Sequence, residues 1–586
     1  MADTLGARAL VIVLAGIGFA FAAIALTIWA FTPNYGSVRA GRADAGYLES
    51  GDCRKCHEWN YTTWHATFHR TMTREADAEA ILGDFEHDNT LTYQGIRAEM
   101  VREGNRYWMK LTGVDGKRQQ LEIVRTVGSR RIQQYLTKDR DKWIRLPVGY
   151  DLVQRRWMHL NGSFFHADGA AYTQHVAEWN SNCVFCHNVK AQPGFDWNNK
   201  SWNTEVAELG IACGACHGPA GEHAQQALSP VTRYRWHLHD QTAVPIAVTN
   251  PAKLDSDRSA MICGHCHGQR LPDPTDRIRT ILSKGDPYDA GKDLREFYQP
   301  VQRDAKVGDF SFASRFWADG SPRLTAYEYQ GMIRSKCFRA GKPGQRITCT
   351  SCHEMHGSDP RGQLTEEKKT NAACTQCHQQ FTKPVQLVEH TKHSAESTGS
   401  LCYNCHMPQI VYGIMSAHRT HDITNPRPDE TVRFDKPNAC NQCHLDWSVN
   451  RAIAETQRLW PKTTAESQFG DKRFDEPEGR RALFAGDAVM RALTAAAMMP
   501  ATDNNAPLLL EAMQDRYPIV RYFAANALAA QYPALPKPDY LAPTETRNAT
   551  LHNWYPRFAP EALRAAKEAR ERLSAGRTET DVEVGE

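Results

Sequence analysis

Residues 349–378 read CTSCHEMHGSDPRGQLTEEKKTNAACTQCH, and they contain one five-residue pattern twice. Each copy has two cysteines three positions apart and a histidine directly after the second cysteine. The pattern occurs eight times in the 586-residue chain and leaves only Cys337 of the 17 cysteines outside it. In chain order, as motifs 1 to 8, the residues are Cys53, Cys56 and His57; Cys183, Cys186 and His187; Cys213, Cys216 and His217; Cys263, Cys266 and His267; Cys349, Cys352 and His353; Cys374, Cys377 and His378; Cys402, Cys405 and His406; and Cys440, Cys443 and His444.

The spacing within each motif has a chemical reason. Two thiols three positions apart can both add to the vinyl groups on one edge of a haem, and the next residue then supplies an axial nitrogen to the iron. Zinc ribbons and iron–sulfur sites also use paired cysteines, but they need four ligands per site and give no reason for a histidine after every pair. A redox disulfide motif does not normally occur eight times. The motifs therefore predict eight covalently bound c-type haems, with the eight motif histidines as proximal iron ligands.

Composition excludes several other classes of protein. The chain has 70 Lys and Arg against 67 Asp and Glu, for a formal charge of +3, which argues against a nucleic-acid binder or an acidic disordered chain. Apolar residues make up 41% and charged residues 23%, as is ordinary for a globular protein.

The N-terminus predicts a membrane anchor. Residues 9–31 contain no charge, and at helical rise they extend roughly 34 Å. A cleaved signal peptide usually has a shorter apolar part followed by a small-residue cleavage site, so an uncleaved transmembrane helix over 1–32 is favoured over that alternative. Because haem is attached outside the cytoplasm, we expect a single-pass protein of the cytoplasmic membrane with its bulk on the periplasmic or other extracytoplasmic side.

The rest of the chain divides by composition. A polar linker is expected over 33–51, followed by an octahaem domain over 52–447 in which short helices and irregular segments wrap the cofactors, so that the fold is mainly α. The 130 residues between motifs 1 and 2 hold alternating segments with Glu103-Gly104-Asn105 and Asp115-Gly116 as turns, which predict a small antiparallel sheet inserted at about 85–150. An excess of Lys and Arg over 97–156 indicates either a solvated face or a docking patch for an acidic partner or a lipid surface.

Beyond Trp447 the motifs stop and amphipathic helical patterns follow. Residues 515–524 are similar to the turn and second helix of a HEAT repeat, so a helical HEAT-like domain is expected over 448–575; an unrelated helical cap is the alternative. A disordered tail is predicted over 576–586.

The residues flanking the motifs resemble a family of bacterial multihaem cytochromes related to the tetrahaem cytochrome of ammonia oxidisers. The likeness covers roughly 51–447 and rests on Trp64-x-x-Thr67-x-His69-x-x-Met72, His159-Leu-Asn-Gly, His175-x-x-x-Trp179-Asn180, Cys216-His217-Gly-Pro-Ala-Gly-Glu-His223, Cys263-Gly-His-Cys266-His267-Gly-Gln-Arg-Leu-Pro, Tyr327-Glu-Tyr, Cys352-His353-Glu-Met-His356-Gly, Cys405-His406-Met-Pro and Pro437-Asn-Ala-Cys440. The resemblance implies electron-transfer chemistry.

Sixteen histidines remain after the eight proximal ones, which is enough to give every iron a second imidazole. Family position favours as distal ligands His69, His159, His175, His223, His237, His356, His393 and His421. The reserves are His65, His166, His239, His265, His390 and His418. Cys337 is expected to be a small buried thiol, with a soft axial ligand or reactive site as the alternative.

Three functions are compatible with this pattern. The first is an electron carrier without catalytic residues, moving electrons from a quinol-oxidising or other respiratory membrane complex to redox partner proteins. The second is an octahaem oxidoreductase acting on a small nitrogen or sulfur compound at one open iron. All eight motifs end in histidine, so the altered proximal ligand seen in such enzymes is missing. The third is a docking subunit that uses the helical C-terminus.

Overall fold

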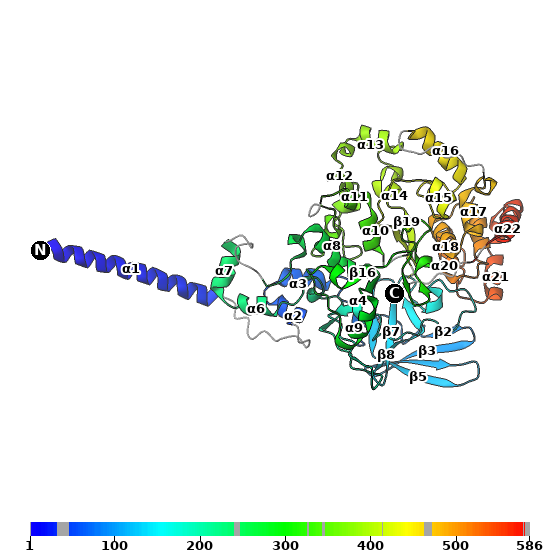
Figure 1. The fold of residues 1–586 in the computed structure, drawn as a ribbon. Coiled ribbons are helices and arrows are strands. Elements are labelled where there is room, and N and C mark those ends of the chain that lie inside the picture. The colour runs from blue at the N-terminus through cyan, green and yellow to red at the C-terminus, as the bar shows by residue number, and fades with distance from the viewer. Residues whose placement is uncertain are drawn as a thin grey trace.

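The structure is a computed structural model, and it describes residues 2–31, 46–238, 247–324, 327–342, 346–412, 414–461, 471–577 and 579. Most of the predicted linker and most of the predicted disordered tail lie outside these residues, as does His239. Figure 1 shows a body of helices and small sheets, with the N-terminal helix α1 (Ala2–Phe31) extending away from it.

The predicted membrane anchor is not supported. Within the described residues, no helix is both long and apolar enough to cross a bilayer, so the predicted single-pass helix and the localisation that depended on it are wrong.

Two antiparallel sheets occupy the long interval between motifs 1 and 2. Strands β2 (Thr90–Tyr93), β3 (Ile96–Glu103), β4 (Arg106–Thr112) and β5 (Arg118–Ile123) form a four-stranded meander. Its β3–β4 hairpin turns at Gly104, whose φ of 64° lies in the left-handed region that glycine adopts without strain. The six-stranded sheet consists of β1 (Thr73–Glu75), β6 (Arg125–Val127), β7 (Ile132–Asp139), β8 (Lys142–Arg145), β9 (Val148–Asp151) and β10 (Arg156–His159). The β structure therefore exceeds the predicted interval of about 85–150 at both ends.

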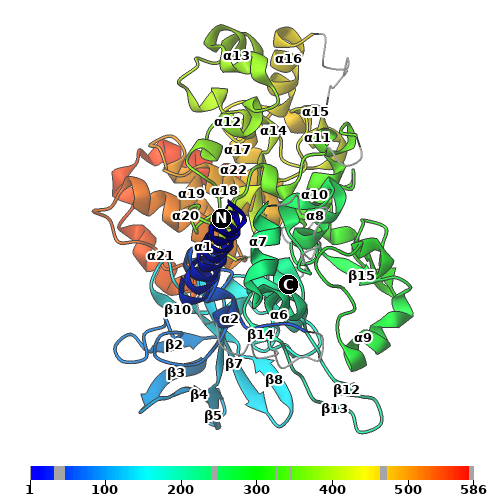
Figure 2. The same cartoon turned by 90° about the vertical axis from the view of Figure 1, so that its left-hand side faces the viewer.

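The motif region is built from short helices and two-stranded ladders, as the wrapping of a chain around several large groups requires. Figure 2 shows these elements on the side from which α1 projects. The helices are α2 (Ser50–Arg54), α3 (Glu58–His65), α4 (Val184–His187), α5 (Cys213–His217), α6 (Gly221–Ala227), α7 (Pro230–Leu238), α8 (Ser256–Gly264), α9 (Ile278–Lys284), α10 (Glu328–Arg334), α11 (Lys336–Arg339), α12 (Ala372–Thr375), α13 (Pro384–Thr391), α14 (Cys402–His406) and α15 (Asp429–Phe434). The ladders pair β11 (Asn188–Val189) with β14 (Glu208–Leu209), β12 (Phe195–Asp196) with β13 (Ser201–Trp202), β15 (Arg270–Pro272) with β16 (Tyr298–Pro300), β17 (Lys306–Val307) with β18 (Phe310–Ser311), and β19 (Gln409–Tyr412) with β20 (Ser416–Arg419).

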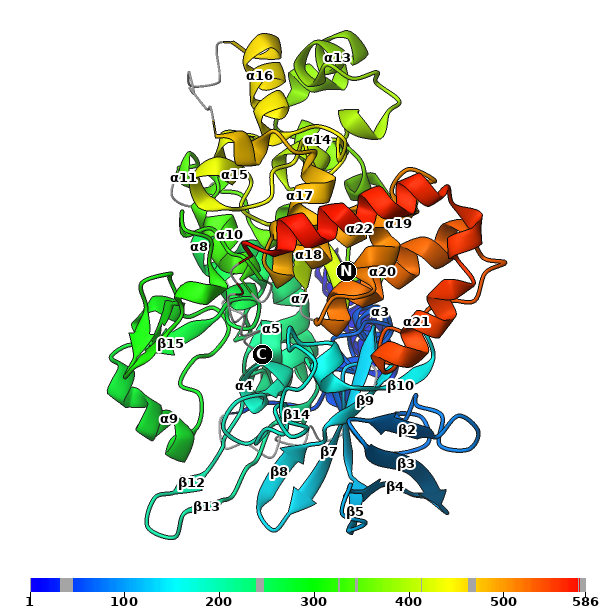
Figure 3. The same cartoon turned by 90° about the vertical axis from the view of Figure 1, so that its right-hand side faces the viewer.

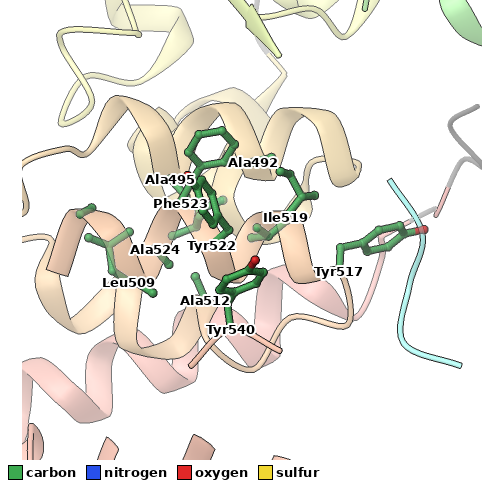
Figure 4. Packing of buried hydrophobic residues seen from close by; sticks show 14 of the residues in the cluster. Ala492, Ala495, Leu509, Ala512, Tyr517, Ile519, Tyr522, Phe523, Ala524 and Tyr540 are labelled. Atoms are coloured by element: carbon green, nitrogen blue, oxygen red, sulfur yellow. The ribbon is translucent and has the colours of Figure 1, made fainter. Parts of the chain in front are cut away.

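The C-terminal part is a layered set of helices, seen together in Figure 3. They are α17 (Glu478–Ala485), α18 (Ala488–Ala497), α19 (Ala506–Ala512), α20 (Pro518–Gln531), α21 (Thr544–His552) and α22 (Pro560–Ser574). Helix α16 (Val449–Leu459) lies apart from them, beside α13. Alanines such as Ala492 and Ala524 let the backbones of α18 and α20 approach closely, and Phe523 fills the space beside them (Figure 4).

The C-terminal helices pack against the β region through both apolar and charged side chains. Met158 and Leu160 belong to the same buried cluster as the side chains of α18 and α20. Arg521, which is 1% exposed, donates hydrogen bonds to both carboxylate oxygens of Asp168 at 2.8 and 3.0 Å. The helices therefore hold the β region, and through it the motif region, in place.

Candidate haem centres

Each motif folds as one helical turn. The histidine N–H donates to the carbonyl of the first cysteine in motifs 1, 2, 4, 5, 6 and 8, at 2.8 to 3.1 Å. Motif 3 forms α5 and motif 7 forms α14. Residues three and four positions apart face the same side of such a turn. The two thiols and the imidazole of every motif are therefore directed to one side, as covalent haem attachment requires.

A connected cavity of about 2760 Å³ runs through the motif region, and cysteines of motifs 2 to 8 line it. Pockets for a single small ligand usually measure about 300–1,000 Å³, and protein interiors do not keep large voids. The cavity is thus of a size for several large groups in contact. Apart from Cys337, its lining thiols are those that the sequence assigns to haem.

Pairs of histidine rings lie across this space at one recurring distance. A metal–imidazole bond of about 2.0 Å puts the ring centroid about 3.2 Å from the metal, so two imidazoles on opposite sides of one metal have centroids about 6.4 Å apart. In the described part of the chain, six motif histidines face a second histidine at this spacing. The pairs are His57 with His223 at 6.3 Å, His267 with His69 at 6.1 Å, His217 with His356 at 6.4 Å, His353 with His421 at 6.2 Å, His406 with His390 at 6.1 Å, and His444 with His393 at 6.2 Å.

The hydrogen bonds of these rings leave the opposite nitrogen for a metal. His217, His353 and His406 each place Nδ1 2.8 to 2.9 Å from a backbone carbonyl oxygen, to which an Nδ1–H donates. His393 does the same at 2.7 Å with the carbonyl of Thr391. An Nδ1–H donor fixes the tautomer that presents Nε2 as the ligand, as is usual for metal-binding histidines.

Burial keeps the facing imidazoles neutral. Desolvation lowers the pKa of His69 to about 4, with a smaller contribution from His267. Desolvation likewise lowers the pKa of His421 to about 4. A ligand imidazole must be unprotonated at the coordinating nitrogen, so these environments match that role.

Five of the eight distal ligands favoured by the sequence therefore lie opposite a motif histidine: His69, His223, His356, His393 and His421. His390, which the sequence placed among the reserves, is brought opposite His406 with an interplanar angle of 3°. The sequence did contain a signal for His390 as a ligand, because His390 and His393 lie three residues apart at the end of a helical pattern.

The other three favoured residues lie elsewhere. His159 has Nε2 3.0 Å from the Tyr172 carbonyl oxygen, and its Nδ1 accepts a hydrogen bond from the Asn161 N–H. His175 packs on Phe164, and desolvation lowers its pKa to about 2. His237 is exposed on α7. Their assignment as ligands stays a prediction.

Motifs 2 and 6 are outside the six pairs. His187 ends α4 and lines the cavity. His378 is exposed, and its ring contact within the described residues is with Phe381 at 6.5 Å. Phe381 in turn packs on His390 at 4.5 Å.

Contacts between cysteines of different motifs give the spatial order of the sites. Thiols of motifs 1 and 3, 2 and 4, 4 and 5, and 6 and 7 lie close together, and thiols of motifs 3 and 4, 5 and 6, and 7 and 8 interact electrostatically over longer distances. Motifs 1, 3, 4, 5, 6, 7 and 8 thus follow one another in space, and motif 2 lies beside motif 4.

Cys337 lies in α11 beside this row, near Cys352 and Cys377. Burial raises the pKa of its thiol, with a smaller contribution from Cys377. The thiol is therefore protonated at neutral pH, which is the state of a small packing group.

One comparison with known proteins agrees with the motifs. Residues 342–383 match the family described as the doubled CXXCH motif, which covers motifs 5 and 6. The motifs and this match support a multihaem c-type cytochrome with covalently bound haem. The crystal structure of the outer cell wall cytochrome OcwA is similar at a TM-score of 0.48 and 15% identity, over 90% of this chain and 100% of that chain. No curated protein matches the sequence.

Proposed function

We propose that this cytochrome is an eight-haem electron conduit in which six haems have two axial histidines. The six ring pairs at 6.1 to 6.4 Å carry the proposal, because that spacing is the one that an iron between two imidazoles requires. A haem with two histidine ligands exchanges electrons and leaves no iron position for a substrate. The residues that flank the motifs support membership of the multihaem cytochromes related to the tetrahaem cytochrome of ammonia oxidisers.

The order of the sites supports a path for the electrons. Thiols of neighbouring motifs in the row lie near one another, so haems attached to them would lie close together. The two ends of the row carry the exposed thiols Cys56 and Cys443, and Cys377 of motif 6 is exposed as well. We infer that redox partner proteins, including a quinol-oxidising or other respiratory complex as donor, exchange electrons at these ends.

Two measurements on the purified protein test this function. Intact mass spectrometry should show the chain plus eight haems, because thioether bonds survive denaturation. Electron paramagnetic resonance of the oxidised protein should assign at least six haems to low-spin, bis-histidine iron. A mass below eight haems, or fewer than six such irons, contradicts the proposal.

A second candidate function places ligand exchange at motif 6. His378 is exposed and has a phenyl ring, not an imidazole, as its ring contact in the described residues. A haem there would be accessible to a small nitrogen or sulfur compound, and the remaining haems would supply or remove its electrons. This reaction would make the protein an oxidoreductase.

Carbon monoxide distinguishes the two candidates. If motif 6 holds an open iron, the reduced protein binds carbon monoxide, and the Cys374→Ala/Cys377→Ala variant loses that binding. The matched Cys440→Ala/Cys443→Ala variant removes a bis-histidine haem and should keep it. Binding that persists without the motif 6 haem, or no binding in the unmodified protein, rules out this second function and leaves the conduit.

A further inference from the structure

Glu328 is a carboxylate directed at an axial histidine. It is the first residue of α10, and its Oε2 lies 3.9 Å from Nδ1 of His267, the motif histidine that faces His69. Its Oε1 lies 3.5 Å from Nε2 of His418. The Oε2 atom is buried and has no hydrogen-bond partner within the described residues.

The backbone holds this carboxylate in place. The Tyr329 N–H donates to the carbonyl of His267 at 2.9 Å, which ties the start of α10 to the end of motif 4. Tyr329 and Met332 bury the same helix in a core with Met261 of α8. The backbone of Glu328 is therefore held beside His267.

The Nδ1 atoms of other motif histidines face uncharged groups. The Nδ1 atoms of His217, His353 and His406 face the neutral carbonyls of Thr249, Gly362 and Thr424. At 3.9 Å the Glu328 Oε2 atom lies beyond hydrogen-bonding distance of His267 Nδ1, so the carboxylate acts on this ring through its negative charge. That charge stabilises the ferric centre, which carries one positive charge more than the ferrous one.

Motif 4 also has the most neighbours in the row. Its thiols lie close to those of motifs 2 and 5, and one of them interacts electrostatically with a thiol of motif 3. In this row of thiols, motif 4 links motifs 1 to 3 with motifs 5 to 8.

We propose that Glu328 is a positioning residue that lowers the reduction potential of the haem at motif 4, so that the junction of the conduit is its low-potential centre. Electrons then cross the junction but do not remain on it, and the sites on each side keep separate electron populations. This inference rests on the proposed bis-histidine conduit.

Potentiometric titration of the holoprotein tests the role. In Glu328→Gln the equilibrium constant for reducing one haem should rise at least about tenfold, which is about 59 mV for a one-electron couple, and the lowest midpoint of the series should move upward. Glu328→Asp keeps the charge, set back by one methylene, and should move the same midpoint by less. Glu511→Gln neutralises a similarly enclosed carboxylate that pairs with Arg570 in the C-terminal helices, and should leave every midpoint in place.

The inference is overturned if Glu328→Gln and Glu328→Asp retain all haems by mass and show unchanged midpoints, or if every midpoint moves equally. If only Glu328→Asp matures, an unchanged lowest midpoint in it also overturns the role. Failure of the conduit itself would be seen separately, as too few bis-histidine irons in the unmodified protein.

Discussion

The substitution His390→Ala tests the histidine pair seen in the structure against the ligands that the sequence alone favoured. His390 lies 6.1 Å from His406 with nearly parallel rings, although the sequence did not favour it as a ligand. His237 was favoured, but it is exposed on α7. If the pair holds an iron, truncation of His390 removes one of its two axial imidazoles and leaves a five-coordinate haem.

The size of the effect follows from the count of sites. One opened iron among eight motifs should increase the carbon monoxide bound per reduced protein by one molecule, and one eighth of the haem should change its spectrum. Added imidazole should occupy the vacated space beside Phe381 and return that haem to low spin. The measurement is a carbon monoxide titration of the reduced protein, followed by absorbance and normalised to haem mass.

His237→Ala is the matched control, and it should leave the carbon monoxide stoichiometry unchanged. An unchanged stoichiometry in His390→Ala would refute the pairing, and with it the use of ring spacing to assign ligands. An increase in His237→Ala would show that the exposed residue, and not the buried pair, coordinates iron.

Three further outcomes follow from the structure. Arg521→Met should lower the free energy of unfolding by about 3 kcal/mol in urea titrations, because it leaves Asp168 and two carbonyls without their buried donor. Burial raises the pKa of Glu208 to about 7, so the contribution of this carboxyl group to stability is present at acidic pH and is lost as the pH rises through that value. Glu208→Gln keeps an acceptor for Ser50 and should therefore be more stable than the unmodified protein at pH 8 but not at pH 4. Thermal melts at both pH values would measure this difference. Cys337→Ser should leave the haem mass and the absorbance spectrum unchanged, since burial raises the pKa of this thiol and keeps it protonated, and a spectral change would show that it is a ligand.

The sequence by itself determined the chemistry within each motif. Two cysteines and a histidine at positions i, i+3 and i+4 share one side of a helical turn whatever surrounds them, so attachment and proximal ligation depend on local geometry alone. The turn at Gly104 and the alternating strands around it are local in the same sense. The N-terminal segment shows that local composition can mislead. Its 23 uncharged residues predict a membrane span, but no helix in the described part of the chain is long and apolar enough to cross a membrane.

Only the tertiary structure decided which histidine faces which motif. His69 follows motif 1 but faces His267 of motif 4, and His356 follows motif 5 but faces His217 of motif 3. No periodicity connects residues so far apart, because their distance is set by how the short helices pack around a common cavity. The same packing brings Glu328 to His267 and exposes His237, and neither placement is encoded in the residues next to them.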